Sequence, residues 1–334
     1  MSTESAAAPR TLGSGPTVFP IALGCMGMSG MYGPSDEAES LATIHAALDA
    51  GITLLDTGDF YGQGHNEMLI GRALRERPGS REQALLSVKF GALRGPDGGW
   101  LGFDGRPAAV ANFLGYTLKR LGVEHIDIYR PARLDPNVPI EETIGAIAKF
   151  VKQGYVRAIG LSEVGPETIR RAHAVHPICD LQIEYSLLSR GPEAQIFPTL
   201  HELGIGVTAY GVLSRGLLSG SKPAAAGDFR AYLPRFTGDN REKNERLVAA
   251  LESLAAEKGV RPARLAIAWV LAKGQAIVPV LGARTRAQLD ETLGALDLDL
   301  SPEEIARIEE AVPASQVAGT RYDPHQMRVL DSEK

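Results

Sequence analysis

The sequence has very little cysteine, with only Cys25 and Cys179 among its 334 residues. Two cysteines so far apart provide neither a disulfide framework nor the spacing of a zinc site, and the seven histidines show no metal-binding spacing either. The first ten residues also lack the basic and apolar regions of a secretory signal. We therefore expect a protein of the reducing cytoplasm that holds no metal.

An excess of positive charge and long apolar runs are missing as well. The formal net charge is −5, and Lys and Arg are not clustered as nucleic-acid binding requires. No run reaches the roughly 18 apolar residues of a membrane span. Hydrophobic residues make up 44% and charged residues 22%, which is ordinary for a globular protein with a sizeable core. Neither a nucleic acid nor a membrane is therefore an expected partner.

Glycine-rich phosphate loops are the third absence. The run Gly13-Ser14-Gly15-Pro16 lacks the third glycine of a dinucleotide fingerprint and follows no predicted strand. No G-x-x-x-x-G-K-[ST] pattern occurs. These absences argue against an open Rossmann sheet and against a P-loop fold.

Short apolar, β-branched runs alternate with segments of helical period such as Glu39–Ala50 and Thr143–Lys152. Strands that are apolar along their length and alternate with helices indicate a parallel sheet covered by helices. Eight such repeats favour one closed α/β barrel, a (β/α)8 TIM barrel, over residues 1–334 as a single domain. The predicted strands are Ile21–Gly24, Ile52–Asp56, Leu85–Lys89, Ile126–Arg130, Val156–Leu161, Asp180–Glu184, Gly206–Tyr210 and Ala276–Leu281.

Three segments lie outside the repeat. Thr11–Pro20 is typical of an N-terminal β-hairpin that closes one end of the barrel. Gly91–Arg106 and Ser214–Asn240 are expected to be long loops after the third and seventh strands. Both loops leave the carboxyl ends of strands, which is the face where barrel active sites form.

Ionisable residues stand where two apolar strands end. Asp56 ends the second strand, Lys89 ends the third, and Tyr61 follows Asp56 by a short loop. Adjacent strands lie about 4.8 Å apart, so an Asp56–Lys89 salt bridge beside Tyr61 is expected. An ammonium favours the phenolate and lowers the tyrosine pKa, and such a tyrosine can protonate a carbonyl oxygen. The alternative is a salt bridge that only closes the barrel, with Tyr61 as a boundary aromatic.

The run DTGDFYG from Asp56 to Gly62, followed by GHNE from Gly64 to Glu67, resembles the signature of the aldo-keto reductases. The run SVK that ends at Lys89 is similar to the segment that carries their catalytic lysine. The resemblance implies an NADPH/NADP+-dependent enzyme that reduces an aldehyde or ketone, a small-molecule carbonyl substrate. It implies Asp56, Tyr61 and Lys89 as catalytic residues.

The resemblance also implies a cofactor site. Ser162 and Gln182 would hold the nicotinamide carboxamide, Tyr210 would stack on the nicotinamide ring, and Arg284 would reach the adenosine 2′-phosphate. The loops after the seventh and eighth barrel strands commonly bind phosphate, and a helix N-terminus with an Arg suits an anion. The remaining implied contacts are Gly211, Leu213, Ser214, Gly216, Leu217, Gly282 and Gln288. Alternatively, Gln288 only caps its helix through the pattern that starts at Thr285.

One position departs from the family. Aldo-keto reductases usually carry a catalytic His after the fourth strand, and this chain has Ala132 there. Arg130 should point to the same side of the strand, deeper in the barrel. Either Arg130, or a water in the vacated volume, polarises the substrate, or Arg130 only pairs with an acid inside the barrel. Tyr32, Trp100, Phe229 and the tail after Pro313 are expected to line the substrate pocket.

Two other functions stay open. Potassium-channel β subunits resemble this family, so the chain could be a non-catalytic NADPH-binding regulatory subunit. Lys89 at the end of a barrel strand could instead form a Schiff base, as in an aldolase. The sequence leaves the physiological substrate, the preferred reaction direction and the oligomeric state undetermined.

Overall fold

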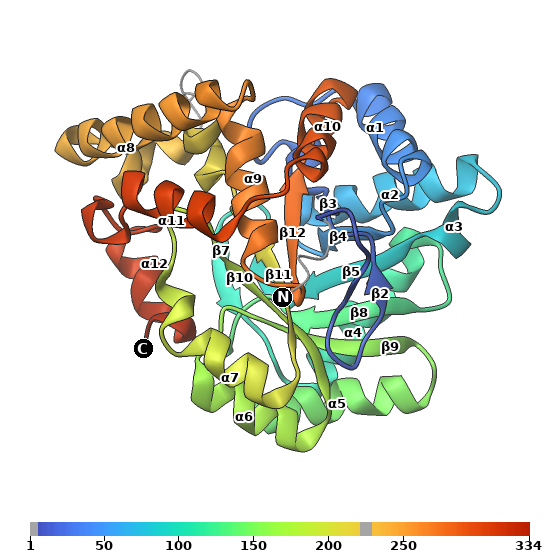
Figure 1. Cartoon of the computed structure of the whole chain (residues 1–334). Helices are drawn as coiled ribbons and strands as arrows, with labels where there is room; N and C mark the ends of the chain where they lie inside the picture. The colour runs from blue at the N-terminus through green and yellow to red at the C-terminus, as the bar shows by residue number, and fades with distance from the viewer. Residues whose placement is uncertain (1–5, 221–228) are drawn as a thin grey trace.

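The eight predicted strands form one closed parallel barrel (Figure 1) in the computed structural model, which describes residues 6–220 and 229–334. The order around the barrel is β10-β11-β12-β3-β4-β5-β8-β9, so strands that follow one another in the chain are neighbours. The predicted fold class is therefore confirmed. The strands are β3 (Ala22–Gly24), β4 (Leu54–Gly58), β5 (Leu85–Phe90), β8 (Ile126–Pro131), β9 (Val156–Ser162), β10 (Ile178–Glu184), β11 (Gly206–Tyr210) and β12 (Ile277–Gly282).

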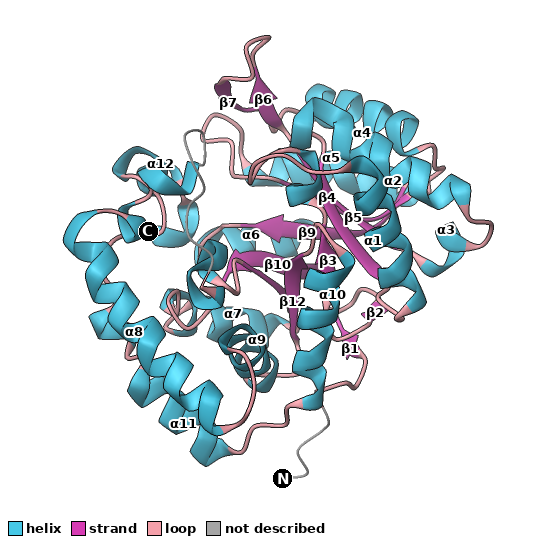
Figure 2. Ribbon diagram, turned by 90° about the horizontal axis from the view of Figure 1, so that it is seen from above, coloured by secondary structure: helices cyan, strands magenta, loops and turns pink. Residues whose placement is uncertain are grey.

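Helices surround the barrel, as the view from above shows (Figure 2). Five of the described helices begin at a proline, because proline fixes a helical φ and the first turn needs no N–H from that residue. The helices are α1 (Glu37–Asp49), α2 (His65–Glu76), α3 (Ser80–Gln83), α4 (Pro107–Leu121), α5 (Ile140–Lys152), α6 (Pro166–Val175), α7 (Ile196–Leu203), α8 (Gly238–Glu257), α9 (Pro262–Ala272), α10 (Arg286–Leu293), α11 (Pro302–Ala311) and α12 (Pro324–Val329).

The predicted N-terminal hairpin closes the amino end of the barrel. It consists of β1 (Arg10–Thr11) and β2 (Thr17–Val18), which pair antiparallel. Leu12 and Val18 join a buried apolar cluster with side chains of the barrel strands. Arg10 donates hydrogen bonds to the backbone carbonyls of residues 271, 274 and 277, which fasten the hairpin to the end of α9 and the start of β12. The opposite, carboxyl end of the barrel is left for the functional site.

The segment expected to be a long loop over 91–106 is a second hairpin. β6 (Ala92–Arg94) pairs antiparallel with β7 (Trp100–Phe103), and this hairpin stands out from the rest of the molecule in Figure 2. The guanidinium of Arg94 lies 3.8 Å from the centroid of the Trp100 ring across the hairpin. Gly98, with φ of 78°, provides the left-handed residue in the turn. The glycines that suggested an irregular loop therefore form a turn between two short strands.

The other expected loop, over 214–240, is partly described. It contains the 3-10 helices η4 (Ser214–Ser219), η5 (Phe229–Tyr232) and η6 (Pro234–Phe236) before α8 begins at Gly238. Residues 221–228 and the side chain of Phe229, one of the expected pocket residues, lie outside the described part of the chain.

Polar residues recur along one face of β10. Asp180, Gln182 and Glu184 are spaced by two, so their side chains point to the same side of the strand, and all three are buried. Barrel interiors are usually filled by layers of branched apolar side chains. In this barrel each of the three polar residues of β10 holds a separate set of charged partners, at increasing height toward the carboxyl end.

Candidate active site

The middle residue of this series, Gln182, meets the predicted salt bridge. Lys89 Nζ lies 2.5 Å from Asp56 Oδ1 and 2.9 Å from Gln182 Oε1, and the Gln182 amide nitrogen donates to Asp56 Oδ2 at 2.8 Å. Asp56 comes from β4 and Lys89 from β5, which pair in the barrel. The three side chains therefore form a closed polar triangle between opposite sides of the barrel.

Ser87 is a fourth member of this group that the sequence analysis did not include. Its hydroxyl donates to Asp56 Oδ2 at 2.9 Å. Ser87 stands two residues before Lys89 on β5, so the period of a strand was the signal that could have found it. The amide of Gln182, which the resemblance assigns to the nicotinamide, bonds to Asp56 and Lys89 in this structure.

Tyr61 begins η2 (Tyr61–Gly64), the turn directly after β4. Lys89 Nζ lies 5.2 Å from the centroid of its ring, so the three predicted catalytic residues are brought together. Burial, and next the charge of Asp56, raise the pKa of Tyr61 well above its ordinary value. The expected lowering of this pKa is therefore not found, because burial and the charge of Asp56 outweigh the opposing charge of Arg133. Tyr61 is a neutral phenol that still has its proton.

Lys89 is buried as well. Burial lowers the pKa of Lys89, and the charge of Asp56 opposes that lowering. Among the residues that the structure describes, the Tyr61 hydroxyl has no hydrogen-bond partner, although only 6% of the residue is exposed. The phenol of Tyr61, next to a buried ammonium, therefore has no hydrogen-bond acceptor within the described part of the chain.

The motif from Gly64 to Glu67 holds the turn that carries Tyr61. The amide nitrogen of Asn66 donates to the Cys25 carbonyl and to Ser29 Oγ, each at 2.8 Å, and its oxygen accepts from Thr57 at 2.6 Å. The buried carboxylate of Glu67 pairs with Arg120. These contacts tie the start of α2 to β4 and to the segment after β3, so the motif positions the turn that carries Tyr61.

Ala132 and Arg130 have different surroundings in the structure. Ala132 follows β8 and is buried, and its backbone N–H bonds to the carbonyl of Phe90. Arg130 is fully buried and pairs with Asp180 and Thr208, each at 3.0 Å. The hypothesis that Arg130 polarises the substrate is therefore wrong, and the alternative of an internal ion pair is confirmed. The reason is depth, because Asp180 lies two residues below Gln182 on β10.

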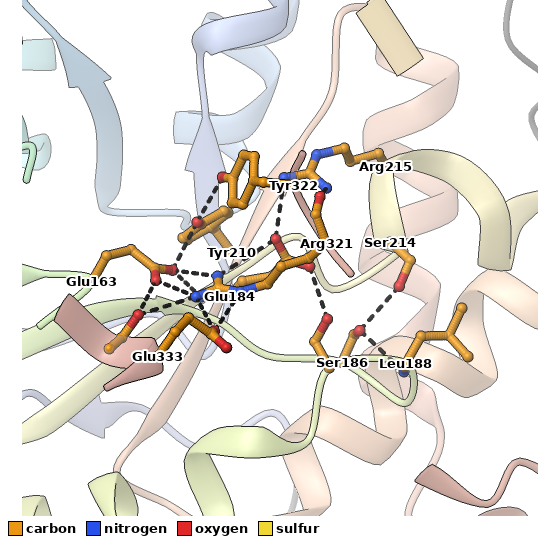
Figure 3. A network of polar contacts seen from close by, with 12 residues as sticks. Glu163, Glu184, Ser186, Leu188, Tyr210, Ser214, Arg215, Arg321, Tyr322 and Glu333 are labelled. Carbon is orange, nitrogen blue, oxygen red and sulfur yellow. Dashed lines mark hydrogen bonds and ion pairs between the residues drawn. The ribbon is translucent and has the colours of Figure 1, made fainter. Parts of the chain in front are cut away.

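The C-terminal tail joins a network of polar residues at the carboxyl ends of β9 and β11 (Figure 3). Arg321 donates to both oxygens of Glu163, at 2.8 and 2.5 Å, and the Tyr210 hydroxyl donates to Glu163 at 2.7 Å. Tyr322 OH lies 3.0 Å from Tyr210 OH. Although burial raises it, the neighbouring Arg321 brings the pKa of Glu163 down to about 2. Sequence reasoning missed this contact because 158 residues separate its partners.

The loop after β11 holds the predicted pyrophosphate contacts Gly211, Leu213, Ser214, Gly216 and Leu217. Ser214, Arg215 and Gly216 have φ of 47°, 56° and 96°, three left-handed residues in a row. Such a conformation costs a non-glycine residue about 1–3 kcal/mol and persists only where the surroundings impose it. Here Arg215 bonds to Glu184 at 3.2 Å and to the Arg321 carbonyl at 2.7 Å. The loop is therefore held in a strained, fixed shape.

Any side chain would be unfavourable at Gly211, the residue at the start of this loop. Its φ is 66°, and a Cβ atom there would lie 2.9 Å from Glu184 Cγ. The glutamate that anchors Arg215 thus lies directly against the glycine. This close approach explains why the chain has glycine at this point.

The remaining predicted cofactor residues lie at the ends of β9 and β12. Ser162 ends β9, and Gly282 ends β12 just before Arg284. Arg284 Nη1 donates to the carbonyls of Tyr32 at 3.1 Å and Pro34 at 3.3 Å. The predicted capping role of Gln288 is present: its N–H donates to Thr285 Oγ1 at 3.3 Å, and its Oε1 accepts from the Arg284 N–H at 2.8 Å.

Within residues 6–220 and 229–334, no cluster of His, Cys, Asp or Glu is arranged to hold a metal ion. In the same part of the chain, no helix is both long and apolar enough to cross a membrane.

Comparison with known proteins gives consistent results. The sequence model of the Aldo/keto reductase family matches residues 20–313. A probable aldo-keto reductase 1 of Glycine max is 43% identical over 328 residues, which cover 96% of this chain and 93% of the relative.

Solved structures with a similar fold indicate the same family. A glycerol dehydrogenase from Gluconobacter oxydans superposes with a TM-score of 0.85 at 30% identity, covering 96% of this chain and 99% of that one. An aldo-keto reductase from Bacillus halodurans in its holo form superposes with a TM-score of 0.77 at 29% identity, with the same coverage. With Asp56, Tyr61 and Lys89 gathered at the mouth of the barrel, the chain belongs to the aldo/keto reductase family, whose members carry out oxidoreduction of carbonyl compounds.

Proposed function

We propose that the chain reduces an aldehyde or ketone to an alcohol with NADPH, and that Tyr61 donates the proton. The observation that carries this proposal is the neutral phenol of Tyr61 beside the buried Lys89–Asp56 pair. NADPH, when bound, supplies the hydride. The reverse reaction, oxidation of an alcohol, uses the same groups, and the related Gluconobacter enzyme is called a glycerol dehydrogenase.

The proton step follows from the charges around Tyr61. As the carbonyl oxygen gains negative charge, the phenol can give it a proton. The resulting phenolate then lies near the ammonium of Lys89, and an opposite charge nearby stabilises the ionised form. Asp56 and Gln182 hold Lys89 in place through bonds of 2.5 and 2.9 Å. Lys89 and Asp56 therefore act on the product side of the proton transfer.

Removing the phenol hydroxyl tests this role directly. General acid catalysis contributes typically about 10²–10⁴-fold, so Tyr61→Phe should lose roughly that factor in turnover. NADPH binding, followed by fluorescence titration, should stay as in the wild type. Undiminished turnover in Tyr61→Phe would rule out Tyr61 as the proton donor.

The cofactor site is proposed from its donor groups. We assign Ser162 and Gln182 to the nicotinamide carboxamide and Tyr210 to the nicotinamide ring. The pyrophosphate is assigned to the strained loop, and the proposed contacts there are Gly211, Leu213, Ser214, Gly216 and Leu217. Gly282 and Gln288 are the remaining proposed cofactor contacts. Arg284 stands just before the N-terminus of α10, where free N–H groups and the helix dipole favour an anion. A guanidinium there fits the 2′-phosphate of NADPH.

Arg284 should set the preference for NADPH over NADH. Hydrogen bonds to a charged group contribute about 1.5–3 kcal/mol, or roughly 10–150-fold in affinity. Arg284→Ala should therefore remove most of the preference, measured as the ratio of the two dissociation constants. Equal affinity of the wild type for both cofactors would make Arg284 a purely structural residue that bonds the carbonyls of Tyr32 and Pro34.

The two alternative functions give different results in the same assays. An aldolase would form a borohydride-trapped adduct at Lys89 without NADPH. Lys89 Nζ, however, already bonds to Asp56 and Gln182, and a charged ammonium is a poor nucleophile. A regulatory subunit would bind NADPH without steady turnover of any carbonyl compound.

A further inference from the structure

Arg133 directly follows Ala132, the position that departs from the family. Its Nη1 donates to the Ala132 carbonyl at 2.6 Å. Its other contacts are long: 3.4 Å from Nη1 to Ser162 Oγ, and 3.5 Å from Nη2 to Tyr322 OH. Most of the five donors of a guanidinium are therefore weakly used.

Three other arginines near this mouth have acidic partners. Arg215 and Arg235 pair with Glu184, and Arg321 pairs with Glu163. Within the described residues, Arg133 makes no ion pair shorter than 4.0 Å, so it is a cation without a carboxylate. Glu163 stabilises its charge only from a distance, because both oxygens of Glu163 are bonded to Arg321.

The Nε donor of Arg133 is free. The residue is half-buried, and its Nε, which bonds to no described residue, is not among the buried side-chain atoms that lack a partner. A donor that is neither buried nor strongly bonded is accessible to a ligand. Ala132, with only a methyl group, adds no polar side chain of its own at this point.

The charge of Arg133 acts on Tyr61. Burial raises the pKa of Tyr61, and Tyr32 and Tyr322 raise it further. The charge of Arg133 opposes this rise. A guanidinium that reaches Ser162 and Tyr322 thus lies near both the proposed proton donor and the tail over the mouth.

We propose that Arg133 binds the carboxylate of the substrate, so that the enzyme prefers carbonyl compounds that are also acids. An unpaired charge in a partly buried site is unfavourable, and a carboxylate can pair with a guanidinium through two parallel hydrogen bonds. This inference rests on the proposed carbonyl reduction and adds the class of substrate, an oxo acid. The usual His at the Ala132 position carries no permanent positive charge and would not make this selection.

A matched pair of substrates tests the preference. 4-Carboxybenzaldehyde and its methyl ester have the same aldehyde and differ in the negative charge. The wild type should show kcat/KM about 10–150-fold higher for the acid. Arg133→Met should bring the ratio close to one, and Arg133→Lys should retain part of it because a point charge remains without the planar fork.

Arg94→Met is the control variant, because Arg94 is a cation of the β6–β7 hairpin that lies over Trp100. It should leave the acid-to-ester ratio unchanged, whereas general electrostatic attraction would lower the ratio in both variants. Equal kcat/KM values for the acid and the ester in the wild type overturn the proposal. So does an Arg133→Met variant in which both substrates lose equally and NADPH binds more weakly, because Arg133 would then hold the cofactor.

A binding measurement separates this proposal from the proposed function. If the wild type reduces neither aldehyde, carbonyl reduction of these compounds has failed, and calorimetry with 4-(hydroxymethyl)benzoate still tests Arg133. We expect its dissociation constant to rise about 10-fold or more in Arg133→Met and to stay unchanged in Arg94→Met. Equal binding to wild type and Arg133→Met overturns the carboxylate site.

Discussion

The barrel holds two buried ion pairs of the same kind that differ in depth. Arg130 and Asp180 form the inner pair, with both side chains 0% exposed. Lys89 and Asp56 form the outer pair, with both side chains 6% exposed. Both pairs bond to residues of β10 or β11, and Gln182 links them through Thr208 at 3.5 Å. A small difference in height therefore separates a pair sealed in the core from one that reaches Tyr61.

This comparison shows that a buried charge pair says little about function by itself. Replacing such a pair by apolar residues is often neutral for stability, whereas removing one partner is costly because the other charge stays buried. The inner pair contacts the Thr208 hydroxyl and the Cys179 thiol, which are both buried in the core. The outer pair has Tyr61, whose ring lies 5.2 Å from Lys89 Nζ, so its charge can change the chemistry of a proton donor.

Breaking the outer pair should give the largest effect, and it should appear in activity. Lys89→Met removes the ammonium that stabilises the Tyr61 phenolate, so turnover should fall about 10²–10⁴-fold. Asp56 keeps its bonds to Ser87 and Gln182, so the loss in free energy of unfolding should be smaller than for the inner pair. Steady-state kcat and urea denaturation of the same preparation measure both effects. Unchanged turnover would reduce the outer pair to a structural contact.

Breaking the inner pair should instead appear in stability. Arg130→Met leaves Asp180 buried with Thr208 as its remaining strong partner, at 2.5 Å, and should lower the free energy of unfolding by about 3–5 kcal/mol. Turnover per folded molecule should stay close to wild type. Urea denaturation followed by circular dichroism, with kcat normalised to the folded fraction, provides the measurement.

The double variant Arg130→Met/Asp180→Leu is the control for the inner pair. Because it removes both charges, it should recover part of the lost stability. A drop in kcat for Arg130→Met as large as that of Lys89→Met would contradict the difference between the two pairs.

The smallest effect should come from crowding the inner pair without removing it. A Cβ atom at Gly160 would lie 2.5 Å from Asp180 Oδ1 and 2.9 Å from Arg130 Nε. Gly160→Ala should therefore cost about 1–3 kcal/mol of unfolding free energy. Gly145→Ala on α5, where a Cβ atom meets nothing within 4 Å, should be neutral or slightly stabilising. Thermal melts of the two variants compare them, and equal melting temperatures would show that the pair can shift.

Local pattern predicted the strands closely where it was strong. The strand Gly206–Tyr210 was predicted residue for residue. The second strand was predicted as Ile52–Asp56 but lies at Leu54–Gly58. The shift arises because Thr57 and Gly58 pair with Val88 and Lys89 of β5, and these pairings carry the strand past its apolar residues.

Asp56 and Lys89 could be predicted because each interrupts an apolar strand at its carboxyl end, where the edges of parallel strands meet. Tyr61 followed from its short distance along the chain. Arg321 could not be predicted, because nothing near it in sequence indicates Glu163 as its partner. The depth of Arg130 also escaped prediction: the strand period gives the side of a residue, and the height of its partner depends on the register between strands.

The order of strands and helices and the placing of Asp56, Tyr61 and Lys89 at one end of the barrel follow from periodicity and capping, which act over a few residues. Which charged groups pair with one another does not follow from these local patterns. The contacts of Gln182 with Lys89, of Arg130 with Asp180 and of the tail with Glu163 depend on strand register and on contacts between distant segments. The same holds for Arg133, which has no acidic partner among the described residues. Those contacts exist only when the closed barrel brings opposite strands and the tail within a few ångströms, because hydrogen bonds and ion pairs act only at such distances.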